Sequence, residues 1–302
     1  MTCEDEAACG QSPSRLGERM SKANFDHIYT APDPRPYFQT LDGLDYQIPA
    51  HGASVFSAVA EHVAEVRDRD TVRIADLCCS YGINAAVMKH EPTFDEIVAH
   101  YTTDDCQALD RDDLLARDHA FFEERLNSPA LEVVGIDVSS EAVGYAVEAG
   151  ILDGGAAEDL ETRDPSPRLA GLLERTDLVT VTGGIGYITE RTVGRVLDAV
   201  PTTPWIAALC LRWVDFDGVA EAGRARDMVV HRLDDVTFPQ RRFADVEEQQ
   251  HVLNELDRIG VDPTGREADG YHHAELFVLH PADEQLMTPL HELVGTTVAV
   301  NR

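Results

Sequence analysis

Short apolar runs alternate with segments of helical periodicity along most of the chain, and this alternation constrains the fold more than any other feature. The apolar runs lie at residues 72–77, 131–136, 177–182, 204–214 and 273–280. Helical periodicity marks residues 52–66, 83–89, 139–150, 189–200 and 245–260. Buried strands that alternate with amphipathic helices predict an α/β fold with a mostly parallel sheet.

Three segments stand outside this alternation. Residues 1–20 are acidic and polar, and we predict a disordered tail there. Residues 21–50 mix aromatic residues with prolines, and we predict that they form a cap over the pocket of the domain at 51–302. Residues 91–130 predict a helical insertion between the first two strands, where it can overhang a ligand crevice.

The chain is strongly acidic, and this limits its partners. Its 302 residues include 55 Asp and Glu against 25 Lys and Arg, which gives a formal net charge of −30. Nucleic acids and anionic membrane surfaces are bound by clustered basic residues, so both are disfavoured as partners. The acid is spread along the whole chain, and self-repulsion of this size is best tolerated in concentrated salt. We therefore expect a salt-adapted source.

The sequence predicts a cytoplasmic protein without a metal. It has no run of about 18 apolar residues, and its N-terminus lacks the basic and apolar regions of a secretory signal. The six cysteines include no CxxC pair, and the neighbours Cys78 and Cys79 cannot readily chelate one zinc ion together. The sequence leaves the oligomeric state open.

The first strand ends in a turn of small residues. Asp76 is followed by Cys78, Ser80 and Gly82 at alternate positions. A dinucleotide-binding turn needs a small sixth residue counted from Cys78, where this chain has Ile83, so NAD binding is disfavoured. The pattern acid–x–small–x–small–x–Gly resembles motif I of the class I S-adenosylmethionine (SAM) dependent methyltransferases, with Cys78 and Ser80 in place of two glycines. The resemblance implies a SAM-binding loop of Asp76, Cys78, Ser80, Tyr81 and Gly82, in which Gly82 leaves room for the carboxypropyl arm of SAM.

Two downstream segments extend the resemblance to the nucleoside. Asp137 stands where the family carries the acid that accepts both ribose hydroxyls, and Val138 follows it. Residues 154–161 resemble the segment that flanks the adenine, with Glu158 or Asp159 as the acceptor for the adenine amino group. Alternatively, Asp137 is only a helix N-terminal acid and Asp159 only a surface acid.

The segment 177–192 resembles the fourth-strand motif, whose end faces both the sulfonium and the acceptor. This implies that Thr182 and Gly183 belong to the SAM site and that Tyr187 is the nearest side chain to the reacting groups. The chain lacks the Asn/Asp–Pro–Pro–Tyr/Phe signature of amino- and base-directed DNA methylases. A packing role for Tyr187 is the alternative.

The cap supplies further candidates. Tyr37 is expected beside SAM, Tyr46 is a candidate catalytic residue, and Arg35 could pair with a substrate carboxylate. Alternatively, the aromatic residues of 27–51 only anchor the N-terminal arm to the core.

The resemblance implies a Rossmann-like class I methyltransferase fold, with a mostly parallel seven-stranded sheet flanked by helices, an N-terminal cap and a helical insertion. It implies a SAM-dependent methyltransferase for a small-molecule acceptor, with SAM as co-substrate and no metal. The stretches CCSYGIN and TGGIGYITERT also resemble the azetidine-2-carboxylate synthases, which cyclise the aminobutyrate arm of SAM and release methylthioadenosine. A non-catalytic SAM-binding module is the third alternative.

Overall fold

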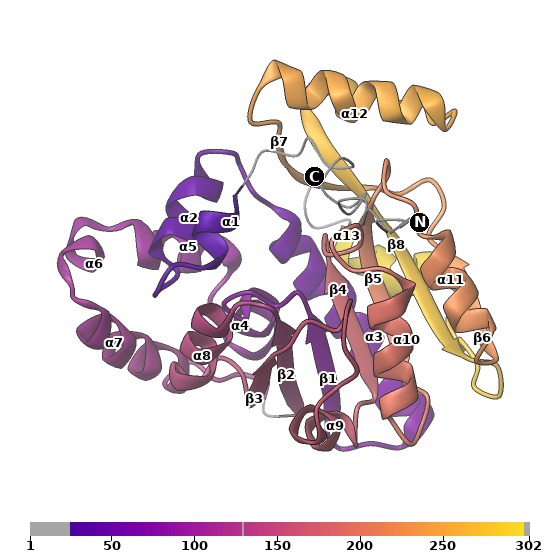
Figure 1. Ribbon diagram of the computed structural model, residues 1–302, viewed down its shortest axis with the longest axis horizontal. Helices are drawn as coiled ribbons and strands as arrows, with labels where there is room; N and C mark the ends of the chain where they lie inside the picture. The colour runs from indigo at the N-terminus through magenta and orange to yellow at the C-terminus, as the bar shows by residue number, and fades with distance from the viewer. Residues whose placement is uncertain (1–24, 129, 299–302) are drawn as a thin grey trace, which may run out of the picture.

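A computed structural model describes residues 25–128 and 130–298, so the tail predicted for residues 1–20 lies outside the described residues. One eight-stranded sheet forms the centre of the molecule, in the order β3-β2-β1-β4-β5-β8-β6, with β7 also paired to β8 (Figure 1). The strands are β1 (Val72–Leu77), β2 (Leu131–Asp137), β3 (Gly154–Ala157), β4 (Leu178–Thr182), β5 (Trp205–Leu211), β6 (Met228–Arg232), β7 (Phe238–Arg242) and β8 (Tyr271–Pro281).

Helices connect and cover these strands. They are α1 (Asp26–Tyr29), α2 (Arg35–Asp42), α3 (Ile48–Arg67), α4 (Ile83–Lys89), α5 (Phe94–Thr102), α6 (Asp104–Ala108), α7 (Arg111–Glu123), α8 (Ser140–Glu148), α9 (Pro167–Leu173), α10 (Glu190–Ala199), α11 (Asp217–Arg224), α12 (Val246–Arg258), the short 3-10 helix η1 (Glu267–Asp269) and α13 (Leu290–Val298). None of the helices in the described ranges is long and apolar enough to span a bilayer.

Strand directions confirm the predicted Rossmann-like α/β fold. Strands β1 to β5 are parallel to one another, whereas β8 is antiparallel to β5, β6 and β7. The expected number of seven strands is wrong, because β7 pairs with the first residues of β8 while β6 pairs with the last. Strand β7 reads FPQRR, and its proline and polar residues gave no strand signal in the sequence.

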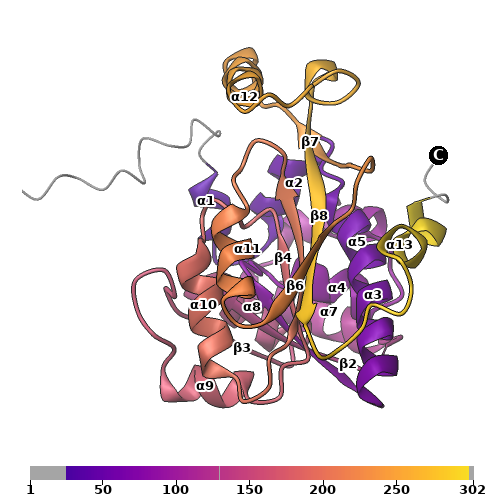
Figure 2. The same ribbon diagram turned by 90° about the vertical axis from the view of Figure 1, so that its right-hand side faces the viewer.

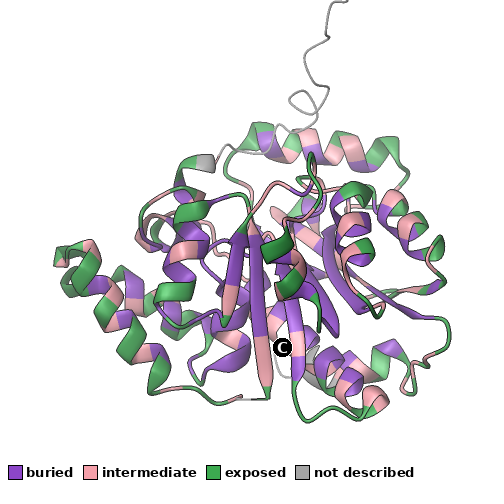
Figure 3. Ribbon diagram, turned by 60° about the horizontal axis from the view of Figure 1, so that its bottom comes forward, coloured by how far each residue is buried: buried purple, intermediate pink, exposed green. Residues whose placement is uncertain are grey.

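Apolar side chains fill both faces of the sheet. On β1, Val72 and Ile74 belong to one buried cluster and Ala75 and Leu77 to the other, as expected when alternate side chains point to opposite faces. Helices α9, α10 and α11 cover the second face, and α3 and α13 cover the first (Figure 2). The central strands are almost entirely buried (Figure 3), which explains why they read as apolar runs.

The insertion at 91–130 joins the main core. Helix α5 contributes Phe94 and Ile97, and helix α7 contributes Phe122, to the cluster that also covers β1. Buried Asp118 fixes α7 to its neighbours, since its carboxylate accepts hydrogen bonds from the hydroxyls of Tyr101 and Tyr145 at 2.6 Å each.

Helix α12 lies apart from the helices that flank the sheet, at the top of Figure 1. We call the segment β7–α12–η1, together with the start of β8, the arm. Val252 and Leu256 of α12 form a small separate cluster with Leu211 and Trp213. Glu248 of α12 is paired with Arg241 of β7 at 2.7 Å, and both side chains are only 2% exposed.

Candidate active site

The carboxyl ends of β1 and β4 lie side by side at the centre of the sheet, where Asp76 is in register with Thr180 and Leu77 with Val181. From β1 the sheet continues through β2 to β3 on one side and through β4 to β5 on the other. Ligands of open α/β sheets bind at such a switch point. The loops that follow β1, β2 and β4 carry most of the site residues that the sequence predicts.

The loop after β1 has a left-handed backbone at alternate residues. The φ angles of Cys78, Ser80 and Gly82 are 57°, 50° and 72°. The first two residues bear the steric strain that glycine would avoid, of about 1–3 kcal/mol each. The amide of Ser80 donates to Asp137 Oδ2 at 2.9 Å, and this bond joins the loops after β1 and β2.

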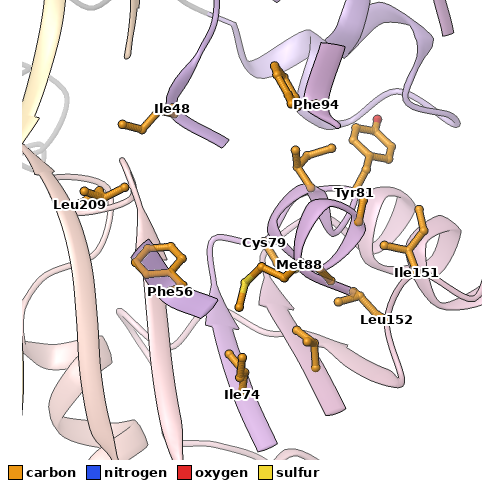
Figure 4. Close-up of a cluster of buried hydrophobic side chains, with 14 of the residues drawn as sticks. Ile48, Phe56, Ile74, Cys79, Tyr81, Met88, Phe94, Ile151, Leu152 and Leu209 are labelled. Carbon is orange, nitrogen blue, oxygen red and sulfur yellow. The ribbon is translucent and has the colours of Figure 1, made fainter. Parts of the chain in front are cut away.

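Gly82 faces the core. A Cβ atom on Gly82 would lie 2.9 Å from Ile151 Cγ2 and 3.1 Å from Leu152 Cγ. Figure 4 shows Ile151 and Leu152 beside α4 in a buried cluster. Packing therefore requires a glycine at position 82, and its place beside the carboxypropyl arm of SAM stays a prediction.

Tyr81 anchors the cap. Its ring is buried, and its hydroxyl donates to the carbonyl of Ala31 at 2.7 Å. The Tyr81 hydroxyl is thereby engaged with the N-terminal segment, and its predicted contact with SAM stays a prediction. The bond holds residues 25–50 against the loop after β1.

Asp76 is a buried acid without a cationic partner among the described residues. Its side chain is 0% exposed, and Oδ1 accepts from Thr180 Oγ1 at 2.7 Å and Asn84 Nδ2 at 3.0 Å. Oδ2 has no hydrogen-bond partner in the described part of the chain. Burial raises the pKa of Asp76 to about 6, against the lowering effect of these two hydrogen bonds. Asn84 also donates to Thr182 Oγ1 at 3.0 Å, so Thr182 lies in the same network.

Asp137 lies at the end of β2 with both carboxylate oxygens in use. Oδ1 accepts from the amide of Ser139 at 3.0 Å, and Oδ2 accepts from Ser80. Each oxygen has two lone pairs, so the carboxylate keeps acceptor capacity for further donors. Val138 beside it is 73% exposed, an unusual state for a large apolar side chain.

Glu158 and Asp159 are both engaged within their own loop. Glu158 accepts from the amide and the hydroxyl of Ser166 at 2.9 and 2.6 Å. Asp159 accepts from Thr162 Oγ1 at 2.6 Å, and this hydrogen bond lowers the pKa of Asp159. These contacts favour the alternative in which Asp159 is a local structural acid.

The two glycines after β4 allow close contacts with Cys78 and Gln240. A Cβ atom on Gly184 would lie 2.8 Å from Cys78 Sγ, so this glycine allows the loops after β1 and β4 to touch. Gly183 has a φ of 64°, and a Cβ atom there would lie 2.6 Å from Gln240 Nε2. Tyr187, three residues beyond Gly184, is 49% exposed.

Tyrosines of the cap gather over these loops. The ring centroid of Tyr37 lies 5.8 Å from that of Tyr29 and 6.2 Å from that of Tyr46. Burial raises the pKa of Tyr46 to about 12 and that of Tyr29 well above its usual value, and the nearby Tyr187 contributes to both increases. The phenols of Tyr29 and Tyr46 are therefore protonated at neutral pH. Tyr29 is close enough to Asp137 for that charge to raise its pKa as well, so the cap approaches the loop after β2.

Arg35 forms several hydrogen bonds within the protein. Its guanidinium forms a bidentate pair with Asp33, with both N–O distances at 2.8 Å, and Nη1 donates to the carbonyl of Leu109 at 2.8 Å. These bonds fasten the cap to the insertion and use donors on all three guanidinium nitrogens. The pairing of Arg35 with a substrate carboxylate stays a prediction.

A cavity of about 160 Å³ adjoins the tyrosine cluster between α2 and α5. Its lining includes Phe38, Tyr46 and Phe94 together with Asp42, Asp45 and Asp95. Within residues 25–128 and 130–298 there is no group of three or more His, Cys, Asp or Glu side chains that could hold a metal ion.

Sequence reasoning missed three polar residues of this region. Asn84 and Thr180 lie inside the motifs that carried the resemblance, and their polarity within otherwise apolar segments was an available signal. Gln240 lies on β7, which had no strand pattern, so no signal placed it beside Gly183.

Comparisons with solved structures return methyltransferases, the class of protein that the motifs resemble. The plantazolicin methyltransferase BpumL, bound to S-adenosylhomocysteine (SAH), matches 84% of this chain and 93% of its own at 10% identity and a TM-score of 0.43. The magnesium protoporphyrin IX methyltransferase of Synechocystis, with bound SAM, matches 76% of this chain and 80% of its own at 13% identity and a TM-score of 0.38. The precorrin-6y C5,15-methyltransferase of Geobacter metallireducens matches 74% and 86% at 11% identity and a TM-score of 0.35. No family model and no curated protein sequence matches the chain. At these TM-scores the similarities assign no activity to this protein.

Proposed function

We propose that this protein is a SAM-dependent methyltransferase for a small-molecule acceptor. The observation that carries the proposal is the left-handed backbone at Cys78, Ser80 and Gly82, hydrogen-bonded to Asp137 at the switch point of the sheet. The chain bears backbone strain at Cys78 and Ser80, the positions where the resembled motif has glycines. Strain of this kind persists where a site requires a particular backbone.

The residues present fit SAM in three places. Asp137 retains lone pairs for the ribose hydroxyls, and exposed Val138 offers an apolar surface to the adenine. Asp76 Oδ2 is a buried acceptor without a partner among the described residues, which suits the ammonium group of the methionine arm. We do not assign the adenine amino group to Glu158 or Asp159, because both are engaged locally.

SAM supplies a methyl carbon activated by a positive sulfonium. The acceptor atom would attack that carbon in line as the carbon–sulfur bond breaks, and SAH would leave after the acceptor loses a proton. Tyr29 and Tyr46 would act through their ring faces and hydroxyls, because their raised pKa values exclude them as bases at neutral pH. Half-exposed Tyr187 is our candidate for orienting the acceptor.

Intramolecular cyclisation is the second candidate, and the closed cap favours it. Tyr81 and the tyrosine cluster hold the cap against the loop after β1. In this reaction the α-amine would attack the γ-carbon of its own arm and lose a proton, the bond from that carbon to sulfur would break, and methylthioadenosine would leave. No separate acceptor is needed, so a small closed site suffices.

One experiment separates these candidates. The purified protein is incubated with SAM alone and with mixtures of small amines, alcohols, thiols and carboxylic acids, and the nucleoside product is identified by chromatography and mass spectrometry. SAH that forms only with an acceptor supports methyl transfer, and methylthioadenosine from SAM alone supports cyclisation. If calorimetry detects binding of SAM or SAH but neither nucleoside forms, the protein is a binding module; if neither ligand binds, the proposal is wrong.

A further inference from the structure

Gln240 is a buried polar residue that the proposed SAM contacts do not use. It lies in the middle of β7, and its side chain is 4% exposed. The carbonyl oxygen Oε1 is fully buried and has no hydrogen-bond partner in the described part of the chain. A buried acceptor without a hydrogen-bond donor destabilises the folded protein, because it has lost its hydrogen bonds to water.

The surroundings of Gln240 place it between the cap and the loop after β4. Its backbone carbonyl accepts from the amide of Gln47, at the start of α3, at 2.8 Å. On the other side, its Nε2 lies 2.6 Å from the position that a Cβ on Gly183 would take. Gly183 directly follows Thr182, the last residue of β4. The side-chain amide therefore fills the space that a larger residue at 183 would occupy, at the edge where the reacting groups are expected.

Arg241, the next residue of β7, is engaged in an ion pair. Arg241 directs its guanidinium to Glu248 of α12, with Nη1 to Oε2 at 3.0 Å and Nη2 to Oε1 at 2.7 Å. Alternate residues of a strand point to opposite sides, which separates Gln240 from that ion pair. The arm thus places the uncharged side-chain amide of Gln240 beside Gly183 and holds the guanidinium of Arg241 in an ion pair with α12.

We propose that Gln240 Oε1 accepts a hydrogen bond from the polar hydrogen of the group that lies beside the sulfonium. This inference rests on the proposed function and deepens it. It requires a reacting group with an N–H or O–H, such as an amine or a hydroxyl. The carboxamide would orient that group without removing its proton, because an amide is not a base.

The test uses two ligands that differ at the inferred position. Sinefungin is a SAM analogue with a carbon-bound amine in place of the sulfonium methyl, and SAH has no group there. We expect Gln240→Leu to lower the affinity for sinefungin about 10- to 100-fold in calorimetry, with SAH affinity unchanged within about twofold. Gln240→Glu keeps an acceptor and should bind sinefungin at least as well as the wild type.

Gln249→Leu is the matched control, because the Gln249 amide lies in the same arm and donates to the carbonyl of Glu267 at 3.0 Å. It should leave the ratio of the two affinities unchanged. If Gln240→Leu weakens both ligands equally, or neither, the inference is wrong while the proposed function stands. If the wild type binds neither ligand, both the proposed function and this inference are wrong. Should Gln240→Leu not fold, the Gln240→Glu variant decides, since a loss of sinefungin affinity there contradicts an acceptor role.

Discussion

Two buried carboxylates in different regions of the molecule have opposite electrostatic settings. Asp76, at the switch point, has only a hydroxyl and an amide as partners, and burial raises its pKa to about 6. Glu248, in the arm, faces Arg241, and its pKa is well below the usual range because hydrogen bonds from His272 and Arg241 outweigh the effect of burial. The paired acid holds the arm together. The unpaired acid has one buried oxygen without a hydrogen-bond partner among the described residues, and we propose this oxygen as a ligand for SAM.

The largest expected effect is the loss of the arm's ion pair. Glu248→Ala leaves the guanidinium of Arg241 buried without its partner, and we expect a loss of about 3–5 kcal/mol in unfolding free energy. Denaturant unfolding measures it. The control is Glu255→Ala on the same helix, whose pair with Arg258 is exposed and should be worth at most about 1 kcal/mol. Equal effects for the two variants would mean that the buried pair does not hold the arm.

Two glycines with nearly equal φ angles allow packing at the switch point to be compared with packing in the arm. Gly82, at the switch point, has a φ of 72°, and Gly265, in the arm, has a φ of 73°. A Cβ at Gly82 meets buried side chains, whereas one at Gly265 meets nothing within 4 Å. We expect Gly82→Val to cost about 2–4 kcal/mol more than Gly265→Val, because only the first adds overpacking to backbone strain. Similar melting temperatures for the two variants would contradict the packing role of Gly82.

The two acids predict opposite pH dependences of stability. The folded-state pKa of Asp76, about 6, is above its ordinary value of 3.8. Its contribution to stability is therefore complete below about pH 4 and is lost as the pH rises through 6, by up to about 3 kcal/mol. For Glu248 the folded-state pKa is below the ordinary 4.5, so its contribution is present above that value and is lost as the pH falls.

Denaturant unfolding of wild type, Asp76→Asn and Glu248→Gln between pH 3.5 and 7.5 measures both dependences. Relative to wild type, Asp76→Asn should gain stability as the pH rises, and the deficit of Glu248→Gln should shrink as the pH falls. Parallel curves for Asp76→Asn and wild type would show that burial does not raise the pKa of Asp76.

A smaller effect is expected on ligand affinity at the end of β2. Asp137→Ala should weaken SAH binding by about 1.5–3 kcal/mol, the range for hydrogen bonds to a charged group. Asp159→Ala, which removes an acid engaged with Thr162 in its own loop, is the control and should change the affinity little. Calorimetry compares them, with melting temperatures as a check on folding. Unchanged affinity in Asp137→Ala would refute the ribose assignment.

The smallest effect is expected from one hydroxyl. Because Tyr187 is half-exposed, Tyr187→Phe should change the unfolding free energy by at most about 0.5 kcal/mol and SAH affinity by a factor of a few. Turnover of SAM should fall about tenfold or more if the hydroxyl orients the reacting group. A silent Tyr187→Phe with a severe Tyr187→Ala would assign the role to the ring face. A lower melting temperature in Tyr187→Ala without loss of turnover per folded molecule would make it a packing residue.

The sequence by itself determined the parallel half of the sheet and the position of its loops. Strands β1, β2, β4 and β5 are buried on both faces and therefore read as apolar runs, and Asp76 and Asp137 follow from the strand ends. The antiparallel half was less visible. Of its strands only β8 had a signal, because β6 and β7 carry polar and charged residues that pair through their backbones.

Only the tertiary structure decided where the site's side chains point. In a loop with left-handed residues there is no fixed period, so the sequence could not tell that Gly82 faces Ile151 or that Tyr81 holds the cap. Arg35 beside Asp33, and Gln240 beside Gly183, depend on contacts between segments far apart in the chain. Periodicity records which face of an element is buried, whereas the partner of each polar side chain is set by packing through space.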